Sequence, residues 1–194
     1  MIPPVEFLWA IIGVLLTIGG TFLEAFVTDP SSLWSQPNIQ IHSLGVTYQI
    51  GAVLLVGCMG GKNAAAMSQI AYLALGLTVL PVFSQGGGFG YLAEPTFGYL
   101  LGFVPGGWVC GFLAFRNHPK LELLGFSCLC GLISIHLVGI LYLVATHLMN
   151  NVGDRMIPLM TAIHSYSLTP LGGQLAVACA VTVISYVLRG LMFY

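Results

Sequence analysis

Residues 121–146 read LELLGFSCLCGLISIHLVGILYLVAT, an apolar run in which Glu122 is the one charged side chain. As an α-helix this run would be about 39 Å long at 1.5 Å per residue. The hydrocarbon core of a bilayer is about 30 Å thick, so about 20 apolar residues suffice to cross it. The run therefore predicts a transmembrane helix.

The rest of the chain is as poor in charge as this run. Of its 194 residues, 6% are Asp, Glu, Lys or Arg and 57% are hydrophobic, whereas a soluble domain carries about 25% charged residues. Five Lys and Arg against six Asp and Glu give a net charge of -1, which leaves no basic surface for phosphates. The composition predicts an integral membrane protein and argues against nucleic acid as a partner.

Six windows are apolar enough to cross a bilayer, or nearly so, and residues rich in Gly, Pro, Asn and Asp separate them. We expect a single domain over residues 1–194 with an all-α membrane fold. No Lys or Arg precedes the first window, which is longer than the apolar core of a cleavable signal peptide, so we expect it to stay as a span. The windows are Val5–Phe26, Gly45–Gly61, Ala64–Phe83, Thr96–Phe115, Leu121–Thr146 and Leu168–Leu191.

The cations predict the orientation of these spans. In a six-span arrangement Lys62, Arg116, Lys120 and Arg189 lie on one side and Arg155 lies on the other. Cytoplasmic loops of membrane proteins are enriched in Lys and Arg, so we expect a multi-pass protein of the cell membrane with both termini in the cytoplasm. The external loops are then 28–44, 84–95 and 147–167, and no loop is long enough to hold an ATPase.

The glycine-rich external loop and the span after it contain candidate ligand-binding groups. Four glycines lie within residues 86–90, but no Gly-Lys-Ser/Thr phosphate motif follows them. Glycine lets backbone approach a ligand closely, and nearby hydroxyl, carboxylate and amide groups are typical of one wall of a small-molecule site. The alternatives are that the glycines form a plain flexible hairpin, that the carboxylate belongs to a solvated loop acid, and that the amides form hydrogen bonds between helices. The candidate substrate-binding residues are Gln49, Gly87, Tyr91, Glu94, Thr96, Tyr99 and Gln174.

The first span carries small residues on one face. Ala10, Gly13 and Thr17 are three or four positions apart, so they form one stripe along a helix. Small residues allow another helix to approach closely. The stripe predicts close packing, either on a helix of the same chain or on a partner subunit.

Cysteines and histidines give little support for a metal site or for catalysis. The five cysteines lie in apolar runs without the two-residue spacing of a metal knuckle, and we interpret them as small hydrophobic residues. His136 and His147 are three helical turns apart, too far to share one ion. No Ser/His/Asp or His-Glu-x-x-His pattern occurs. We therefore expect no enzyme activity, cofactor or metal, while a haem held by His147 and His164 stays open as an alternative.

Residues 45–115 resemble the BioY family, the biotin-binding S components of energy-coupling factor (ECF) transporters. Elsewhere the resemblance is weak and rests mainly on the order of the spans. The segments that carry it are VTYQIGAVLL (46–55), YLALGL (72–77), LPVF (80–83), GGG (86–88), PT (95–96) and GYLLGF (98–103).

The resemblance implies a six-helix S component that captures biotin from outside, under a cover that includes the loop between the third and fourth spans. It also implies energy from a membrane T subunit and a pair of ATPases, with the T subunit docking on the small residues Ala10, Gly13 and Thr17. The family commonly has an Asp and a Lys three residues apart at the start of the last span, where this chain has PLGGQLA (170–176). The alternatives are an S component for a different small vitamin, a haem or metal redox subunit, and a structural subunit.

Overall fold

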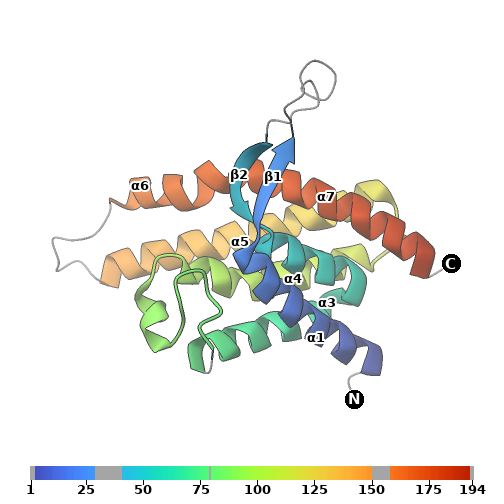
Figure 1. Ribbon diagram of the computed structural model, residues 1–194, viewed down its shortest axis with the longest axis horizontal. Helices are drawn as coiled ribbons and strands as arrows, with labels where there is room; N and C mark the ends of the chain where they lie inside the picture. Colours follow the sequence, from blue (N-terminus) through green and yellow to red (C-terminus); the bar gives the residue numbers. More distant parts are fainter. Residues whose placement is uncertain (1–2, 29–40, 79, 150–157, 193–194) are drawn as a thin grey trace.

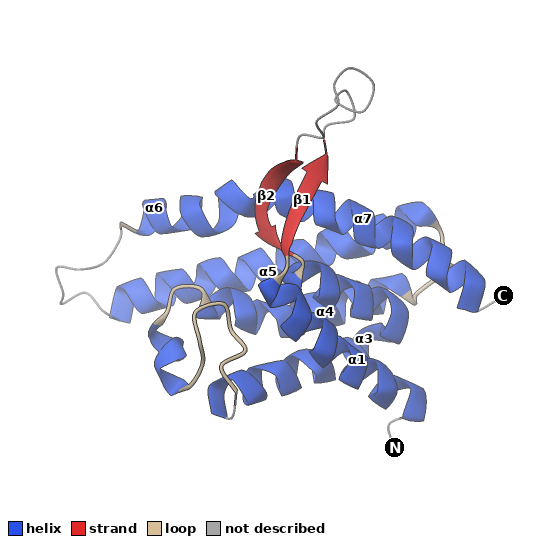
Figure 2. Ribbon diagram, in the orientation of Figure 1, coloured by secondary structure: helices blue, strands red, loops and turns tan. Residues whose placement is uncertain are grey.

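The protein folds into a bundle of long helices with a two-stranded β-hairpin at its edge, as Figures 1 and 2 show. We describe a computed structural model, which covers residues 3–28, 41–78, 80–149 and 158–192. The predicted all-α membrane fold is confirmed in its main features. The helices are α1 (Pro4–Phe22), α3 (Gln49–Thr78), α4 (Phe97–Ala114), α5 (Leu121–Met149), α6 (Leu159–Ile163) and α7 (Thr169–Met192), and the strands are β1 (Glu24–Thr28) and β2 (Ile41–Thr47).

Helix α3 contains two of the six expected spans. Gly61 has φ 81° and ψ 179°, a conformation that glycine adopts readily and other residues do not. The chain reverses there. A Cβ atom on Gly20 would lie 3.0 Å from the backbone of Gln49, and one on Gly60 would lie 2.7 Å from Trp9, so residues 49–60 run antiparallel to α1.

The second half of α3, residues 62–78, runs parallel to α1. Asn63 donates a hydrogen bond to the Glu6 carboxylate, and Thr21 lies 3.4 Å from the Tyr72 hydroxyl. The start of α1 thus contacts the start of residues 62–78, and the end of α1 contacts a later part of the same segment. Among the described residues five helical stretches are long and apolar enough to span a membrane, and because α3 is folded on itself they form six helical segments.

The sequence prediction was wrong where it extended the first span to Phe26 and began the second at Gly45. Helix α1 ends at Phe22, and β1 pairs antiparallel with β2, with Phe26 opposite Ser43 and Thr28 opposite Ile41. Aromatic and β-branched residues such as Phe26 favour strands. Pairing the two strands satisfies backbone groups that a helix would otherwise have bonded internally.

The last span also differs from the prediction, because its helix begins nine residues before Leu168. Helix α6 continues through a π-helical stretch, His164–Leu168, into α7. The wider π turn precedes Pro170, whose ring cannot fit a regular helix interior. Part of the expected loop, residues 150–157 with Arg155, lies outside the described residues, as do residues 29–40 of the first external loop.

Helices α4 and α5 approach each other through glycines. A Cβ atom on Gly102 would lie 2.7 Å from the carbonyl oxygen of Ile135, and one on Gly131 would lie 2.9 Å from the carbonyl oxygen of Gly106. These contacts are backbone against backbone, which is how helices in lipid gain close van der Waals packing. They fix α4 and α5 as the rigid centre on which the functional end is built.

The turn at Gly61 gives a direct test of this packing. A Cβ atom on Gly111 of α4 would lie 2.5 Å from the backbone nitrogen of Lys62. Backbone atoms cannot rotate away, so we expect Gly111→Ala to destabilise the protein by about 1–3 kcal/mol. Thermal unfolding in detergent measures this. Gly19→Ala is the control, because no atom lies within 4 Å of that position; equal melting temperatures for the two variants would contradict the packing described.

Candidate functional site

A cavity of about 210 Å³ lies where several elements begin or end, far from the last turns of α4 and α7. Strand β2 and the first turn of α3 form one side, and the loop after α3 with the start of α4 forms another. The π-helical stretch and the first turns of α7 complete it. Its lining residues are Gly45, Val46, Thr47, Gln49, Ile50, Ser84, Tyr91, Thr96, Tyr99, Leu100, Phe103, Tyr166, Pro170 and Gln174.

Gln49 is positioned by a buried tyrosine behind the cavity wall. Its Nε2 donates to the Tyr72 hydroxyl at 2.9 Å, and that hydroxyl donates to the carbonyl oxygen of Val82 at 3.2 Å. Tyr72 is fully buried. This chain of bonds fixes the amide plane of Gln49, and its Oε1 accepts no hydrogen bond from the residues that the structure describes. The oxygen is therefore available to a ligand.

Tyr91 and Thr96 form the wall that the glycine-rich loop contributes. The Thr96 hydroxyl donates to the Tyr91 hydroxyl at 3.3 Å, and Ser84 lies 3.2 Å from the same oxygen. The Tyr91 ring packs on Phe83 and Phe97, with centroids 4.7 and 6.4 Å apart. Such aromatic packing holds the loop against the helices, so the cavity has a rigid wall on this side.

Gln174 and Tyr99 form the opposite wall. Gln174 Oε1 lies 2.7 Å from Nε2 of His136, which requires a proton on that ring nitrogen. The Tyr99 hydroxyl lies 2.5 Å from Ser167 Oγ. These bonds join α4, α5 and the last helix. Within the described part of the chain, Nε2 of Gln174 has no hydrogen-bond partner and can donate to a ligand.

Five of the seven sequence-predicted residues line this cavity, and two do not. Gly87 lies in the neighbouring loop, where a Cβ atom would come within 2.7 Å of the carbonyl oxygen of Gly76. Glu94 is exposed, and its backbone closes turns with Tyr91 and Phe97. Both residues shape the loop without reaching the cavity.

Sequence reasoning missed Tyr166, Ser84 and Thr47 in the lining. Tyr166 was assigned to an external loop, and it reaches the cavity because the last helix begins before it. Thr47 was placed inside a span, although it belongs to β2. No local pattern in the sequence marks Tyr166 as a lining residue.

None of the lining residues that the structure describes is charged. The cavity offers amide and hydroxyl groups on an aromatic and aliphatic surface, the usual composition of a small-molecule site. At about 210 Å³ it is smaller than the ~300 Å³ at which sites for drug-sized ligands begin. The geometry suits one small, largely uncharged ring system with hydrogen-bonding edges.

The small-residue stripe of α1 lies inside the bundle. Ala10, Gly13 and Thr17 are buried, and a Cβ atom on Gly13 would lie 2.7 Å from that of Ser68. Gln69 Nε2 donates to Thr17 Oγ1 at 3.0 Å. The stripe thus packs on α3 of the same chain, and the outer face of α1 is formed by large apolar residues.

The histidines of the haem alternative have other neighbours. His136 is bonded to Gln174, and His164 Nδ1 lies 3.4 Å from the Thr169 hydroxyl. Among the described residues no interaction links His147 to His164.

Comparison with known proteins gives consistent matches along the chain. The model of the BioY family matches residues 9–192. A probable biotin transporter BioY of Lysinibacillus sphaericus is 42% identical over 98 residues, half of each chain. An uncharacterised 21.2 kDa protein of Cyanophora paradoxa is 25% identical over 185 residues, 95% of each chain.

The fold has a match among solved structures. The crystal structure of the S-component for biotin from an ECF-type ABC transporter superposes with a TM-score of 0.70, over 95% of this chain and 90% of that one. At 22% identity this shows a shared fold. The chain aligns with about half the length of the Lysinibacillus relative.

Removal of one hydroxyl tests the hydrogen bonds behind the cavity. Tyr72→Phe leaves the Gln49 amide and the Val82 carbonyl without their partner. We expect a loss of about 1–3 kcal/mol in stability, because unsatisfied buried polar groups are costly. Thermal unfolding in detergent measures it, with Tyr186→Phe as the control because Tyr186 is 46% exposed. A Tyr72→Phe protein as stable as Tyr186→Phe would contradict these bonds.

Proposed function

The chain belongs to the BioY family, and on this premise we propose that it is the substrate-capture component of a vitamin transporter and binds biotin. One observation carries the proposal. The family match spans residues 9–192, and the cavity in the same fold is lined by Gln49, Tyr91, Thr96, Tyr99 and Gln174. The proposed mechanism is binding and release through reorientation in the membrane, without covalent chemistry.

The protein is a multi-pass membrane protein, and we propose that its cavity faces the outside. Arg116, Lys120 and Arg189 line one hollow, and Lys62 and Arg116 line a second one beside it. All Lys and Arg in the described ranges therefore lie at the end where α1 begins and α7 ends. This collection of cations supports a cytoplasmic location for both termini. The cavity, at the opposite end, would then open to the exterior.

The chemistry of biotin supports the assignment. Its ureido group has two N–H donors and one carbonyl acceptor, and its fused rings are apolar. Gln49 Oε1 can accept from the ureido group and Gln174 Nε2 can donate to it, since neither atom is bonded within the described residues. Tyr91, Tyr99 and Phe103 provide surface for the rings. Gly87 and Glu94 would contribute by shaping the loop that carries Tyr91.

The biotin carboxylate requires a different explanation. The Asp and Lys expected from the family resemblance are absent from residues 170–176, and the described lining has no charge. We propose that hydroxyl and backbone N–H groups hold the carboxylate. Arg155, the other candidate, lies outside the described residues.

We further propose that a membrane T subunit and a pair of ATPases energise transport, because the segments that join the described helices are too short to hold an ATPase. Ala10, Gly13 and Thr17 would influence docking through the position that they give α1 against α3. A Gly13→Leu substitution would clash with Ser68 and disturb the fold as well. It therefore cannot separate docking from folding.

The uncharged lining also favours a second candidate, a different small vitamin with a neutral heterocycle. A competition panel separates the two candidates. Displacement of a bound vitamin by riboflavin or another uncharged vitamin, with no displacement by biotin, would select the second.

Labelled biotin should bind the purified protein with a dissociation constant of about 1 μM or lower. Gln174→Ala and Tyr99→Ala should each weaken binding about tenfold or more, since a lost hydrogen bond is worth roughly 1 kcal/mol and ring contacts add to it. Equilibrium binding measures this, with Tyr186→Ala as the control, because that exposed residue lies on α7 away from the cavity. Millimolar affinity for the unaltered protein would refute the biotin assignment.

Biotinamide, in which a neutral amide replaces the carboxylate, tests the uncharged site. We expect its affinity to be within about threefold of that of biotin, because no cation compensates for desolvation of the carboxylate. Competition against labelled biotin measures the ratio. A loss of hundredfold or more would show that a cation holds the carboxylate, and Arg155 would be the first residue to substitute.

A further inference from the structure

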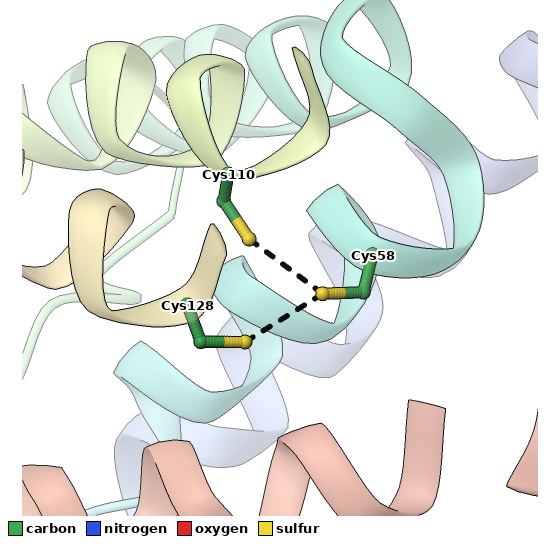
Figure 3. Close-up of side chains that lie close together, drawn as sticks. All are labelled: Cys58, Cys110 and Cys128. Carbon is green, nitrogen blue, oxygen red and sulfur yellow. Dashed lines mark hydrogen bonds between the residues drawn. The ribbon is translucent and has the colours of Figure 1, made fainter. Parts of the chain in front are cut away.

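Three cysteine thiols from three different helices meet in the core, as Figure 3 shows. Cys58 of α3 lies with its sulfur 3.6 Å from the sulfur of Cys110 in α4 and 3.6 Å from that of Cys128 in α5. All three sulfurs lie within 4.8 Å of one another, and the three residues are 0% exposed. The sequence shows no metal-binding spacing here because each residue comes from a different helix.

The sulfur spacing matches what one metal ion requires. Metal–sulfur bonds of about 2.3 Å place sulfur ligands about 3.8 Å apart in a tetrahedral site and about 4.0 Å apart in a trigonal one. The two sulfur–sulfur distances of 3.6 Å lie just below these values, and the third is at most 4.8 Å. An ion could therefore be bound with sulfur movements of less than about 1 Å, which rotation about the Cα–Cβ bonds can supply.

The surroundings hold further groups for such a site. Ser185 of α7 is 0% exposed and lies beside Cys58, and its hydroxyl oxygen has no hydrogen-bond partner of ordinary geometry among the described residues. A buried hydroxyl without a partner is costly, so its place beside the thiols needs an explanation. The Cys110 thiol also lies 3.6 Å from the carbonyl oxygen of Leu54.

The backbone around Cys110 is tightly fixed by glycines. A Cβ atom on Gly57 would lie 3.1 Å from the Cys110 Cβ, and one on Gly131 would lie 2.9 Å from it. Larger residues at either position would displace Cys110 from the other two thiols. The packing therefore holds the three sulfurs in a defined triangle.

From this cluster we infer a binding site for one soft metal ion, best suited to Cu(I). Thiol and thiolate ligands select soft ions such as Cu(I) and Zn(II), and three sulfurs satisfy the coordination of Cu(I). Zn(II) usually takes four ligands, so it would need the Ser185 hydroxyl or the Leu54 carbonyl as well. The site is independent of the proposed vitamin cavity, which shares no residue with it.

Metal binding at this site requires proton release, because a cysteine binds a metal as its thiolate. A Cu(I) ion that replaces one thiol proton leaves the net charge of the buried site unchanged, and each further thiolate adds a negative charge that is costly in an apolar interior. Arg189, one helical turn after Ser185, is buried and donates to the carbonyl oxygen of Ala114. Its positive charge lies on the cytoplasmic side proposed above and would offset a second thiolate.

A bound ion would join the last turns of α4 and the first turns of α5 to α3 close to its turn at Gly61, at the end of the bundle that carries the cations. It would stabilise the folded protein because a ligand that binds only the folded state shifts the unfolding equilibrium. The measurable consequence is a higher melting temperature for copper-loaded protein than for the metal-free form.

The test uses the full chain produced in cells supplied with copper and purified without oxygen. We expect about one copper per chain by elemental analysis. Cys58→Ser, Cys110→Ser and Cys128→Ser should each lose most of it. The matched control is Cys130→Ser combined with Cys179→Ser, because these two cysteines lie outside the cluster, and it should keep the copper.

Folded unaltered protein without copper, or a triple cluster variant that retains copper, would overturn the site. If the cluster variants fail to fold, X-ray absorption at the copper edge of the unaltered protein decides. Three sulfur neighbours support the site, and only nitrogen or oxygen neighbours refute it. A parallel preparation in zinc distinguishes the two ions, since bound zinc with no bound copper would refute the preference for Cu(I).

Discussion

Every backbone N–H and C=O group of this chain that lies within a bilayer must find its partner inside the protein, because lipid offers none. The six helical segments meet this demand through bonds within each helix, and each departure from helix geometry lies where other contacts of the fold compensate for it. The reversal at Gly61 packs against Gly111 of α4. The segment after α1 pairs with β2 in an antiparallel hairpin. The π-helical stretch lies directly before Pro170, where a regular helix would have to accommodate the proline ring.

The same demand applies to polar side chains, and the structure satisfies several of them by hydrogen bonds between helices. Tyr72 connects the two halves of α3 through Gln49 and reaches Val82 beyond its end. His136 and Gln174 connect α5 to α7. These bonds fix the positions of two amides whose remaining atoms are available to a ligand. The groups that position the cavity wall are thus the groups that hold the bundle together.

The two ends of the bundle have different chemistry. The cavity end has amides, hydroxyls and aromatic rings but no charge in its described lining. The other end has the cations, and the triangle of cysteines lies in the core between α3, α4 and α5. An S component that takes up a ligand from one side and contacts energising subunits on the other would need this asymmetry. The close glycine contacts between α4 and α5 form one rigid centre, which holds both ends of the bundle in place.

The sequence by itself determined the membrane class, the approximate positions of the long helices, the side on which cations collect and five lining residues, because apolar length, charge and turn residues are local properties. It could not determine the hairpin, the early start of the last helix or the contribution of Tyr166, since these depend on pairing between distant segments. Only the tertiary structure decided that the α1 stripe packs internally and that Cys58, Cys110 and Cys128 meet. Their spacing along the chain does not predict the cluster, because it forms only when three separate helices pack together.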